Sequence, residues 1–312
     1  MYTVPDQTGR TIIVTGANSG TGKEATARLA GAGARVIMAV RSPEKGEAAR
    51  RDLLNRVPGA QLELRRIDLA DFASVRAFAD GVLTDGERID TLVNNAGVMV
   101  PPKRTVTVDG HELQWQSNFL GPFLLTNLLL PRLLESPAPR VATMSSGTAN
   151  FGGIHFADLD SERRYRAGRA YAQSKLADLL MTLRLAALSD ARGWGLLSTA
   201  AHPGYTRTNL QTAGRNLARS DDKALQPSRR TLLPSQGVEQ GAEPLLFAAV
   251  DPAAEQGAYY GPDRWALVGP THRATLPRSA RGHDFPTSLW AVAAGIVGVD
   301  AQTTLGSAAA SK

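Results

Sequence analysis

The chain has 312 residues, of which 43% are hydrophobic and 21% charged, a balance typical of a folded globular protein. Its 35 Lys and Arg against 29 Asp and Glu give a net charge of +6, without the long basic block that nucleic-acid arms carry. The absence of cysteine excludes disulfides, thiolate catalysis and Cys-based zinc sites, and the five scattered histidines lack metal-ligand spacing. We therefore expect neither a nucleic-acid partner nor a metal.

The terminal segments give no sign of export or membrane insertion. The N-terminus has no basic stretch followed by an apolar core, and no apolar run approaches the ~18 residues of a membrane-spanning helix. These absences predict a cytoplasmic protein without a membrane span. The nearest apolar run, residues 288–299, favours a C-terminal segment packed on the body, and an anchor on a membrane surface is the alternative.

Short apolar runs with strand character recur along the chain, at 11–16, 34–40, 62–68, 89–97, 140–146 and 196–204, with a candidate for a seventh at 257–263. The stretches between them, such as 23–33 and 71–83, have helical spacing. Alternating strands and helices predict a parallel sheet, because parallel strands need crossover connections. We expect an α/β Rossmann fold, a doubly wound parallel sheet of about seven strands with helices on both faces.

No linker divides the chain and no internal repeat is visible, so one domain over 1–312 is predicted. Its core is expected over about residues 8–260. Residues 209–237 are polar and Arg-rich, which indicates an excursion over the body that serves as a substrate loop. Residues 261–312 form a C-terminal extension, which has little pattern before Trp290.

The turn after the first expected strand is rich in glycine. Glycine permits backbone torsions closed to other residues and lets the main chain approach a diphosphate, while the following helix presents free N–H groups and its positive dipole end. This arrangement predicts a dinucleotide site, and glycines that only allow tight helix packing are the alternative. The residues expected at the cofactor in this turn are Gly16, Asn18, Ser19, Gly20, Thr21 and Gly22.

The end of the second expected strand bears on which dinucleotide binds. Arg41 and Ser42 stand where a carboxylate would hydrogen-bond the adenosine ribose of NAD. A guanidinium suits a phosphate, and the missing acid removes a repulsion. NADP(H) is therefore the preferred cofactor and NAD(H) a possible one, unless Arg41 is an ordinary surface arginine.

A tyrosine and a lysine one helical turn apart form a candidate catalytic pair. Tyr171 and Lys175 lie at i and i+4, on one face of a segment with helical spacing. The pKa of a tyrosine is about 10, and a nearby ammonium favours the phenolate and moves that pKa toward neutrality. The pair alone is weak evidence, since the same spacing occurs on many solvated helices.

The ordered set of motifs resembles the short-chain dehydrogenase/reductase family, from about residue 8 to 260. The motifs are the glycine-rich turn led by Thr15, NNAG at 94–97, Asn118, the serines 145 and 146, YAQSK at 171–175 and PGYTRT at 203–208. Within that family the chain looks most similar to the retinol-dehydrogenase-like branch. These spaced motifs in order are far more specific than any one of them.

The resemblance implies a catalytic set of four residues. Tyr171 would give a proton to the substrate carbonyl in reduction and accept one in oxidation. Lys175 would lower the pKa of that tyrosine and bond the nicotinamide ribose. Ser146 would hold the carbonyl oxygen beside the phenol, and Asn118 would anchor a water leading from Lys175 to solvent.

The resemblance also assigns further cofactor contacts along the chain. Besides Tyr171 and Lys175, these are Asp68 and Leu69 toward the adenine, Asn95, Ala96 and Gly97 on the adenosine side, and Pro203, Gly204, Thr206 and Thr208 toward the nicotinamide and diphosphate. Each also has a plain reading, as a helix-capping aspartate, a tight turn or a turn that ends a strand.

Two internal rivals compete with the catalytic set. Tyr165 and Arg169 copy the spacing of the tyrosine–lysine pair, but an arginine stays charged and cannot relay a proton, and Tyr165 precedes the regular helix. Ser145 competes with Ser146. Adjacent residues of a strand point opposite ways, so only one of the two serines can face the cleft.

The substrate is expected against the loop after Ser146 and the excursion. The side chains expected there are Trp115, Phe151, Ile154, Phe156 and Tyr205, which suggest a lipophilic carbonyl or alcohol, although the Arg-rich excursion would also suit an acidic or carrier-linked substrate. The predicted function is an NADP-preferring carbonyl reductase or alcohol dehydrogenase. The alternative is an NADP-binding regulatory or interaction protein without turnover, and a homo-oligomer is possible through the helix of Tyr171.

Overall fold

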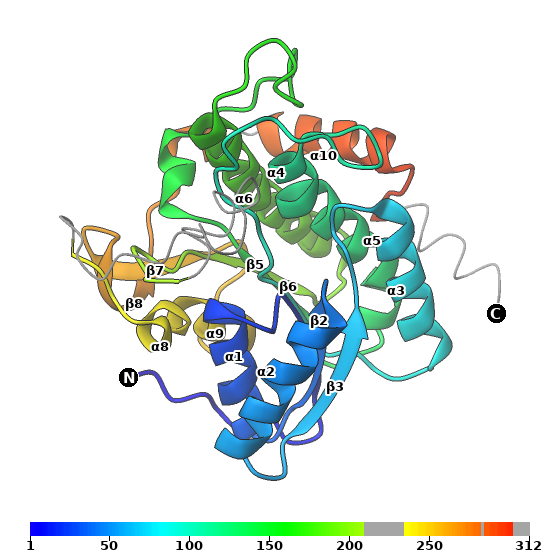
Figure 1. Cartoon of the computed structure of the whole chain (residues 1–312), viewed down its shortest axis with the longest axis vertical. Helices are drawn as coiled ribbons and strands as arrows, with labels where there is room; N and C mark the ends of the chain where they lie inside the picture. Colours follow the sequence, from blue (N-terminus) through cyan, green and yellow to red (C-terminus); the bar gives the residue numbers. More distant parts are fainter. Residues whose placement is uncertain (209–233, 282–283, 302–312) are drawn as a thin grey trace.

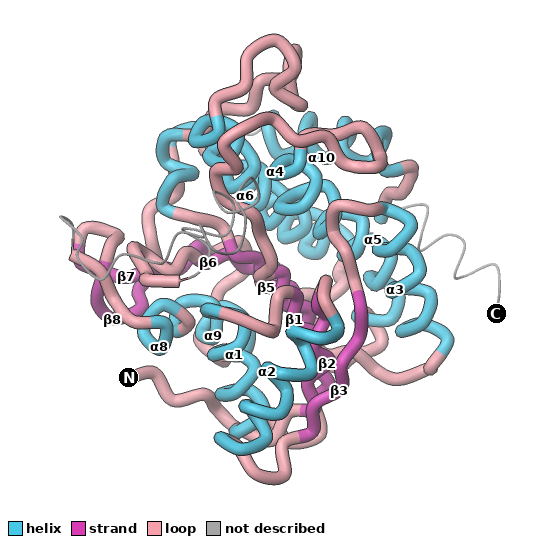
Figure 2. Tube along the Cα trace, in the orientation of Figure 1, coloured by secondary structure: helices cyan, strands magenta, loops and turns pink. Residues whose placement is uncertain are grey.

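The computed structural model describes residues 1–208, 234–281 and 284–301. Eight strands form one sheet in the order β3-β2-β1-β4-β5-β6-β7-β8. The first seven are parallel and β8 is antiparallel to β7. Figures 1 and 2 show these strands crossing the middle of the molecule with helices around them. In chain order, the strands are Thr11–Thr15, Arg35–Val40, Gln61–Arg66, Thr91–Asn94, Arg140–Met144, Leu197–Ala201, Tyr259–Arg264 and Val268–Arg273.

Helices cover both faces of this sheet (Figure 1). One face carries α1 (Gly20–Gly31), α2 (Pro43–Arg56) and α9 (Glu243–Val250), preceded by the short α8 (Val238–Gly241). The other face carries α3 (Phe72–Thr84), α4 (Leu113–Trp115), the π-helical turn η1 (Gln116–Leu120), α5 (Gly121–Leu133), α6 (Ala167–Arg192) and α10 (Asp284–Val297). The described residues also include the 3-10 turns η2 (Gly147–Phe151) and η4 (Arg278–Ala280).

The sheet separates two hydrophobic cores because successive strand residues point to opposite faces. On β1, Ile12 and Val14 pack toward α1, α2 and α9, whereas Ile13 packs toward α3, α5 and α6. Since the interior strands are buried on both sides, they read in sequence as continuous apolar runs. The predicted doubly wound Rossmann fold is confirmed.

The sheet has one strand more than the sequence indicated. Strand β8, with the sequence VGPTHR, contains Gly269 and Pro270 and is mostly exposed. Gly and Pro are found on edge strands, where one side of the strand needs no hydrogen-bond partner. They also interrupt the alternation of apolar and polar residues by which a strand is recognised in sequence. The extension after residue 260 therefore begins by completing the sheet.

The apolar segment near the C-terminus is a helix packed on the body, as expected. Leu289, Trp290 and Ala293 of α10 are buried, and the Trp290 ring meets Phe123 of α5 edge-on with 4.7 Å between centroids. The Arg76 side chain of α3 donates to the Val297 carbonyl at 2.6 Å, which ties the end of α10 to the same layer. Within the described residues, no helix combines the length and the apolar character that crossing a bilayer requires.

Candidate active site

The site lies where the strand order reverses, at the carboxyl ends of β1 and β4, where doubly wound sheets bind ligands. The β1–α1 turn takes backbone torsions that favour glycine, with φ of +68° at Gly16 and +53° at Gly20. A Cβ on Gly22 would come within 2.3 Å of the Asn95 amide nitrogen and 2.5 Å of the Gly16 carbonyl oxygen. Tight packing therefore requires glycine at position 22, whether or not the turn also binds a dinucleotide.

The first turn of α1 is open to an anion. Its N-cap, Ser19, makes no side-chain hydrogen bond to the helix, so its hydroxyl does not cap the N–H groups of this first turn. Asn18, Ser19 and Thr21 are all partly or largely exposed. Free N–H donors at the positive end of a helix dipole are the donor set that a diphosphate requires.

The NNAG segment at 94–97 forms hydrogen bonds that hold this turn in place. The Asn95 side chain donates to the Thr15 carbonyl at 2.9 Å and accepts from the Thr21 hydroxyl at 2.9 Å. The Thr15 hydroxyl accepts from the backbone N–H groups of Asn95 and Ala96, each at 3.0 Å. Asn95 thus supports the glycine-rich turn, and an adenosine contact at these residues stays a prediction.

Two exposed arginines stand at the ends of the neighbouring strands β2 and β3. Arg41 follows β2 and is exposed, and Ser42 caps α2 by accepting from the Lys45 N–H at 3.4 Å. Arg66, which we did not predict, ends β3 opposite Val40, one residue before Arg41. Neither arginine forms an ion pair within the described part of the chain. The adjacent arginines at 65 and 66 were a visible signal, but the strand register was needed to place the second one.

Asp68 is not a helix cap. Its carboxylate accepts from the Ala70 N–H at 3.0 Å, within its own turn. The cap of α3 is Asp71, which accepts from Ala73 and Ser74 at 2.9 and 3.3 Å. The plain alternative for Asp68 is therefore wrong. Leu69 beside it is buried, and a Cβ on Gly121 would approach the Leu69 carbonyl oxygen to 2.4 Å.

The tyrosine and lysine of α6 lie on its buried face, with 5% and 3% of their surfaces exposed. The Ser145 hydroxyl donates to the Lys175 carbonyl at 2.6 Å and so turns toward α6. The Ser146 hydroxyl, in contrast, accepts from the Thr148 N–H at 3.2 Å at the start of η2, and its polar interaction with the Tyr171 phenol lowers the pKa of that phenol. Of the two serines, Ser146 is the one that acts on the tyrosine, and its catalytic role stays a prediction.

Tyr165 is held away from this pair. It precedes the start of α6 at Ala167, and its hydroxyl donates to the Pro101 carbonyl at 2.9 Å. The Gln114 amide donates to the same hydroxyl at 3.2 Å. The second tyrosine therefore ties two loops together, which agrees with the choice of Tyr171.

The surroundings of Tyr171 shift its pKa in opposite directions. Burial raises the pKa of Tyr171, while the Lys175 ammonium and, to a smaller extent, the Ser146 hydrogen bond lower it. The Lys175 amine donates to the Met144 carbonyl at 2.9 Å and to the carboxylate of Asp178 at 2.8 Å. Asp178 had not been singled out from the sequence, although an acid three residues after a lysine on one helix is a visible signal.

Asn118 lies in the π-helical turn η1, a kind of irregularity that is frequent at functional sites. Its side chain accepts from the Val98 N–H at 2.7 Å and donates to the Ser174 hydroxyl at 2.9 Å. An ideal Cβ on Gly97 would lie 3.2 Å from the Asn118 side-chain oxygen and 3.6 Å from the Lys175 amine. The loop after β4 therefore brings the predicted asparagine and lysine to the same place.

The segment after β6 lies over the glycine-rich turn. Gly204 has a φ of +62°, and a Cβ there would come within 2.3 Å of the Leu267 carbonyl oxygen. Gln236 donates to the Pro203 carbonyl at 2.9 Å, and Thr206 also donates to that carbonyl. The Thr208 side chain lies 3.6 Å from an ideal Cβ of Gly20. The four positions predicted to contact the cofactor, Pro203, Gly204, Thr206 and Thr208, thus lie between β7–β8 and the start of α1.

On the substrate side, one expectation is wrong. Trp115 does not line a cleft: it is 1% exposed and packs on Phe119 with 4.7 Å between ring centroids, because η1 continues the buried face of α5. Phe151 is 89% exposed, and Phe156 stacks on Phe285 of α10. Residues 209–233 of the predicted substrate loop lie outside the described residues.

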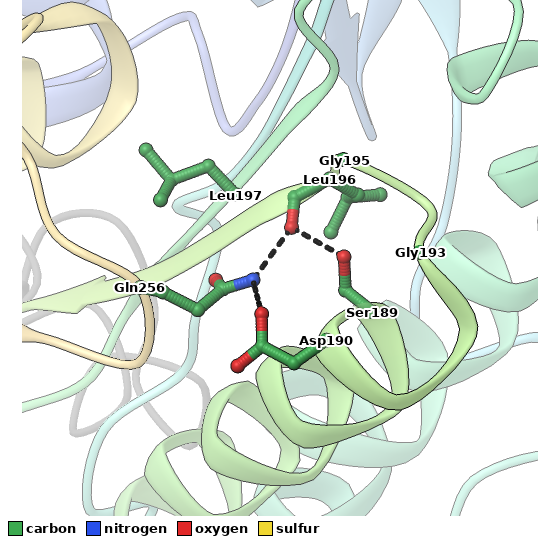
Figure 3. Close-up of a pocket in the computed structure, with 7 residues that line it drawn as sticks. All are labelled: Ser189, Asp190, Gly193, Gly195, Leu196, Leu197 and Gln256. Carbon is green, nitrogen blue, oxygen red and sulfur yellow. Dashed lines mark hydrogen bonds between the residues drawn. The ribbon is translucent and has the colours of Figure 1, made fainter.

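A depression at the other end of the strands is separate from this site (Figure 3). Its polar groups bond one another: Ser189 and Gln256 both donate to the Leu196 carbonyl, at 2.7 and 2.8 Å, and Gln256 also donates to Asp190 at 3.2 Å. It lies at the start of β6, away from the carboxyl ends of the strands. Throughout the described ranges, no three His, Asp or Glu side chains gather in a way that could hold a metal.

Comparisons with known proteins agree with this geometry. A family model for short chain dehydrogenases matches residues 10–217. Human retinol dehydrogenase 13 is 38% identical over 297 residues, covering 94% of this chain and 86% of that protein. Human retinol dehydrogenase 11 is 43% identical over 202 residues, covering 65% of this chain and 63% of that protein, so the match spans just under two thirds of that relative.

Solved structures give the same result. A Mycobacterium paratuberculosis protein described as uncharacterised superposes with a TM-score of 0.78 at 39% identity, covering 95% of this chain and 96% of its own. A short chain dehydrogenase of Escherichia coli in complex with NADPH superposes with a TM-score of 0.53 at 28% identity, covering 71% of this chain and 86% of its own.

Proposed function

The chain belongs to the short-chain dehydrogenase family, and from this premise we propose that it transfers hydride between NADP(H) and the carbonyl or alcohol group of a lipophilic substrate. The observation that carries the proposal is the burial of Tyr171 and Lys175 on one face of α6, where the Lys175 ammonium and Ser146 both lower the pKa of the Tyr171 phenol against the effect of burial. A protein that only bound the cofactor would have no need of a buried proton donor held between a hydroxyl and an ammonium.

A bound NADP(H) would supply the hydride for reduction and take it up in oxidation, and the chain's own residues would handle the proton. The Tyr171 phenol donates its proton to the carbonyl oxygen as reduction proceeds and, as phenolate, removes the hydroxyl proton in oxidation. The Ser146 hydroxyl holds that oxygen beside the phenol and stabilises its developing negative charge. Lys175 acts through charge, since its ammonium stabilises the phenolate.

The preference for NADP(H) is supported by the charge at the ends of β2 and β3. Arg41 and Arg66 have no ion partner within the described residues, and no acid follows β2 directly. A 2′-phosphate placed there would meet two cations instead of a repelling carboxylate. The related Escherichia coli protein in complex with NADPH agrees with this preference.

A lipophilic substrate is supported by the loop after Ser146 and by the relatives named retinol dehydrogenases. Phe151 is nearly fully exposed, and Phe156 stays partly exposed beside Phe285 of α10, so this loop presents apolar surface to solvent. A substrate chain packed there would gain about 0.8 kcal/mol, or roughly fourfold in kcat/KM, for each methylene it buries.

A panel of carbonyls tests the proposal. NADPH oxidation would be followed with aldehydes of increasing chain length, with retinaldehyde and with short polar aldehydes. We expect kcat/KM to rise with chain length, and Phe151→Ala to reduce that rise, while Val108→Ala, at another exposed apolar side chain, leaves it unchanged. Cofactor binding without turnover of any member would favour the non-catalytic alternative, and a preference for the polar members would contradict a lipophilic substrate.

A further inference from the structure

Asp178 is a buried acid in direct contact with the catalytic lysine, and the mechanism above makes no use of it. It lies on α6 one turn after Lys175, is 1% exposed, and accepts from the lysine amine at 2.8 Å. Its other carboxylate oxygen is buried and has no hydrogen-bond partner among the described residues. Burying a carboxylate oxygen without a hydrogen-bond partner costs free energy, so an acid at this position needs an explanation.

The electrostatics of the pair supply that reason. Burial alone would lower the pKa of Lys175, but the Asp178 charge, helped by Tyr171, raises that pKa above its ordinary value. Burial raises the pKa of Asp178 to about 7, against the opposing effect of Lys175. The two groups therefore titrate as a unit, and each depends on the other for its charge.

Few other groups act on this unit. From β5, the Met144 carbonyl accepts from the lysine amine. From β7, the buried Tyr259 phenol lies near Tyr171, and burial raises its pKa so that it stays neutral. No further titratable group within the described residues, including those of η2, η1, β6 and α10, acts on Lys175 or Asp178.

We propose that Asp178 is a positioning residue for the proton-transfer pair: it keeps the Lys175 ammonium charged, and fixed next to Gly97, at a depth where burial alone would neutralise it. The proposal rests on the proposed function in taking Tyr171 as the proton-transfer group. Asp178 does not touch the reacting atoms. It acts on Tyr171 mainly through Lys175, and its own charge has a smaller, opposite effect that raises the pKa of Tyr171.

The pH profile of alcohol oxidation tests this role. In the native protein, kcat should rise with pH as Tyr171 loses its proton. In Asp178→Asn, which keeps the shape but removes the charge, Lys175 loses its proton at lower pH and no longer favours the phenolate. We expect the rising limb to move up by about one pH unit or more, with a smaller change in the KM of the alcohol.

The matched control is Asp190→Asn, the same substitution at the exposed end of α6, which should leave the profile in place. A limb of the Asp178→Asn profile that stays in place, or that moves to lower pH, would overturn the proposal. A downward movement would mean that Asp178 only opposes the effect of the lysine on Tyr171.

A second measurement needs no turnover. Lys175→Met and Asp178→Asn each leave one member of a buried pair without its partner, so each should lower the Tm. The double variant removes both charges, and its Tm should recover most of the loss. Losses that simply add would overturn the proposal. Because this cycle reports on the pair alone, it separates a failure here from a failure of the proposed function, which would show as a native protein inactive on the whole carbonyl panel.

Discussion

The two halves of the site treat charge in opposite ways. In the half built on α6, Lys175 and Asp178 are buried and compensate each other within the fold. In the half at the ends of β2 and β3, Arg41 and Arg66 are exposed and unpaired within the described residues. Charge that serves proton transfer must be fixed before the substrate arrives, whereas charge that selects a cofactor is useful only when left for the ligand.

The largest effect should come from the buried half, at Tyr171. Tyr171→Phe removes only the phenol oxygen and keeps the ring, so it should lower kcat by about 10²- to 10⁴-fold with little change in NADPH affinity. Steady-state rates with any accepted carbonyl, beside a fluorescence titration of the cofactor, measure both. Tyr165→Phe is the control, because that hydroxyl only links two loops. Equal rates for the native protein and Tyr171→Phe would remove the buried half from the mechanism.

A second buried titratable group, His202 directly after β6, should control stability in acid. Burial, and then the charge of His272, lower the pKa of His202 to about 4, below its unfolded value of about 6.5. The unfolded chain therefore binds the proton first, and the stability that this histidine contributes above pH 6.5 is lost as the pH falls toward 4. The loss is about 3 kcal/mol.

Thermal melts between pH 7 and 4 measure this loss as the difference between the native protein and His202→Gln. Asp178 acts with the opposite sign, since its raised pKa means that stability is lost as pH rises from about 4 to 7, and it is present in both proteins. His155→Gln, at a half-exposed histidine, should follow the native curve. A constant difference between the native protein and His202→Gln across this range would show that His202 does not titrate in the fold.

On the exposed side of the site, a side chain at Gly22 of the glycine-rich turn should lower stability. Gly22→Ala would force a Cβ against Asn95 and the Gly16 carbonyl, costing about 1–3 kcal/mol of unfolding free energy and weakening cofactor binding. Gly81→Ala in α3 is the control, because its Cβ would meet nothing within 4 Å and should stabilise the helix by about 0.5–1 kcal/mol. Denaturant unfolding of both variants measures these changes in the free energy of unfolding. An unchanged free energy of unfolding in Gly22→Ala would mean that the turn can rearrange to accept the methyl group.

The smallest effect should be the one that selects the cofactor. Arg41→Ala should weaken NADPH binding about tenfold and leave NADH binding unchanged, because an exposed cation loses part of its contribution to solvent. Arg66→Ala should act in the same direction. Arg50→Ala, whose partner Glu47 lies on the same helix, should do neither. Titrations of all three with both nucleotides measure this, and an equal loss for NADH would place Arg41 away from the 2′-phosphate.

Local patterns in the sequence predicted what depends on neighbours along the chain. The glycine-rich turn follows from torsions that glycine alone adopts easily, and the common face of Tyr171 and Lys175 follows from the helical repeat. The strand-and-helix order likewise predicted the doubly wound sheet, because crossover geometry leaves few alternatives.

Only the tertiary structure decided what depends on contacts between distant segments. The register of β2 and β3 places Arg66 opposite Val40, one residue before Arg41. The packing of β5 on α6 distinguishes Ser146 from Ser145, and packing on Phe119 of η1 buries Trp115. Asp178 shows the limit of local patterns most clearly. Its spacing from Lys175 was visible, but spacing does not reveal burial, and burial is what turns an ordinary helix-surface pair into one whose two charges depend on each other.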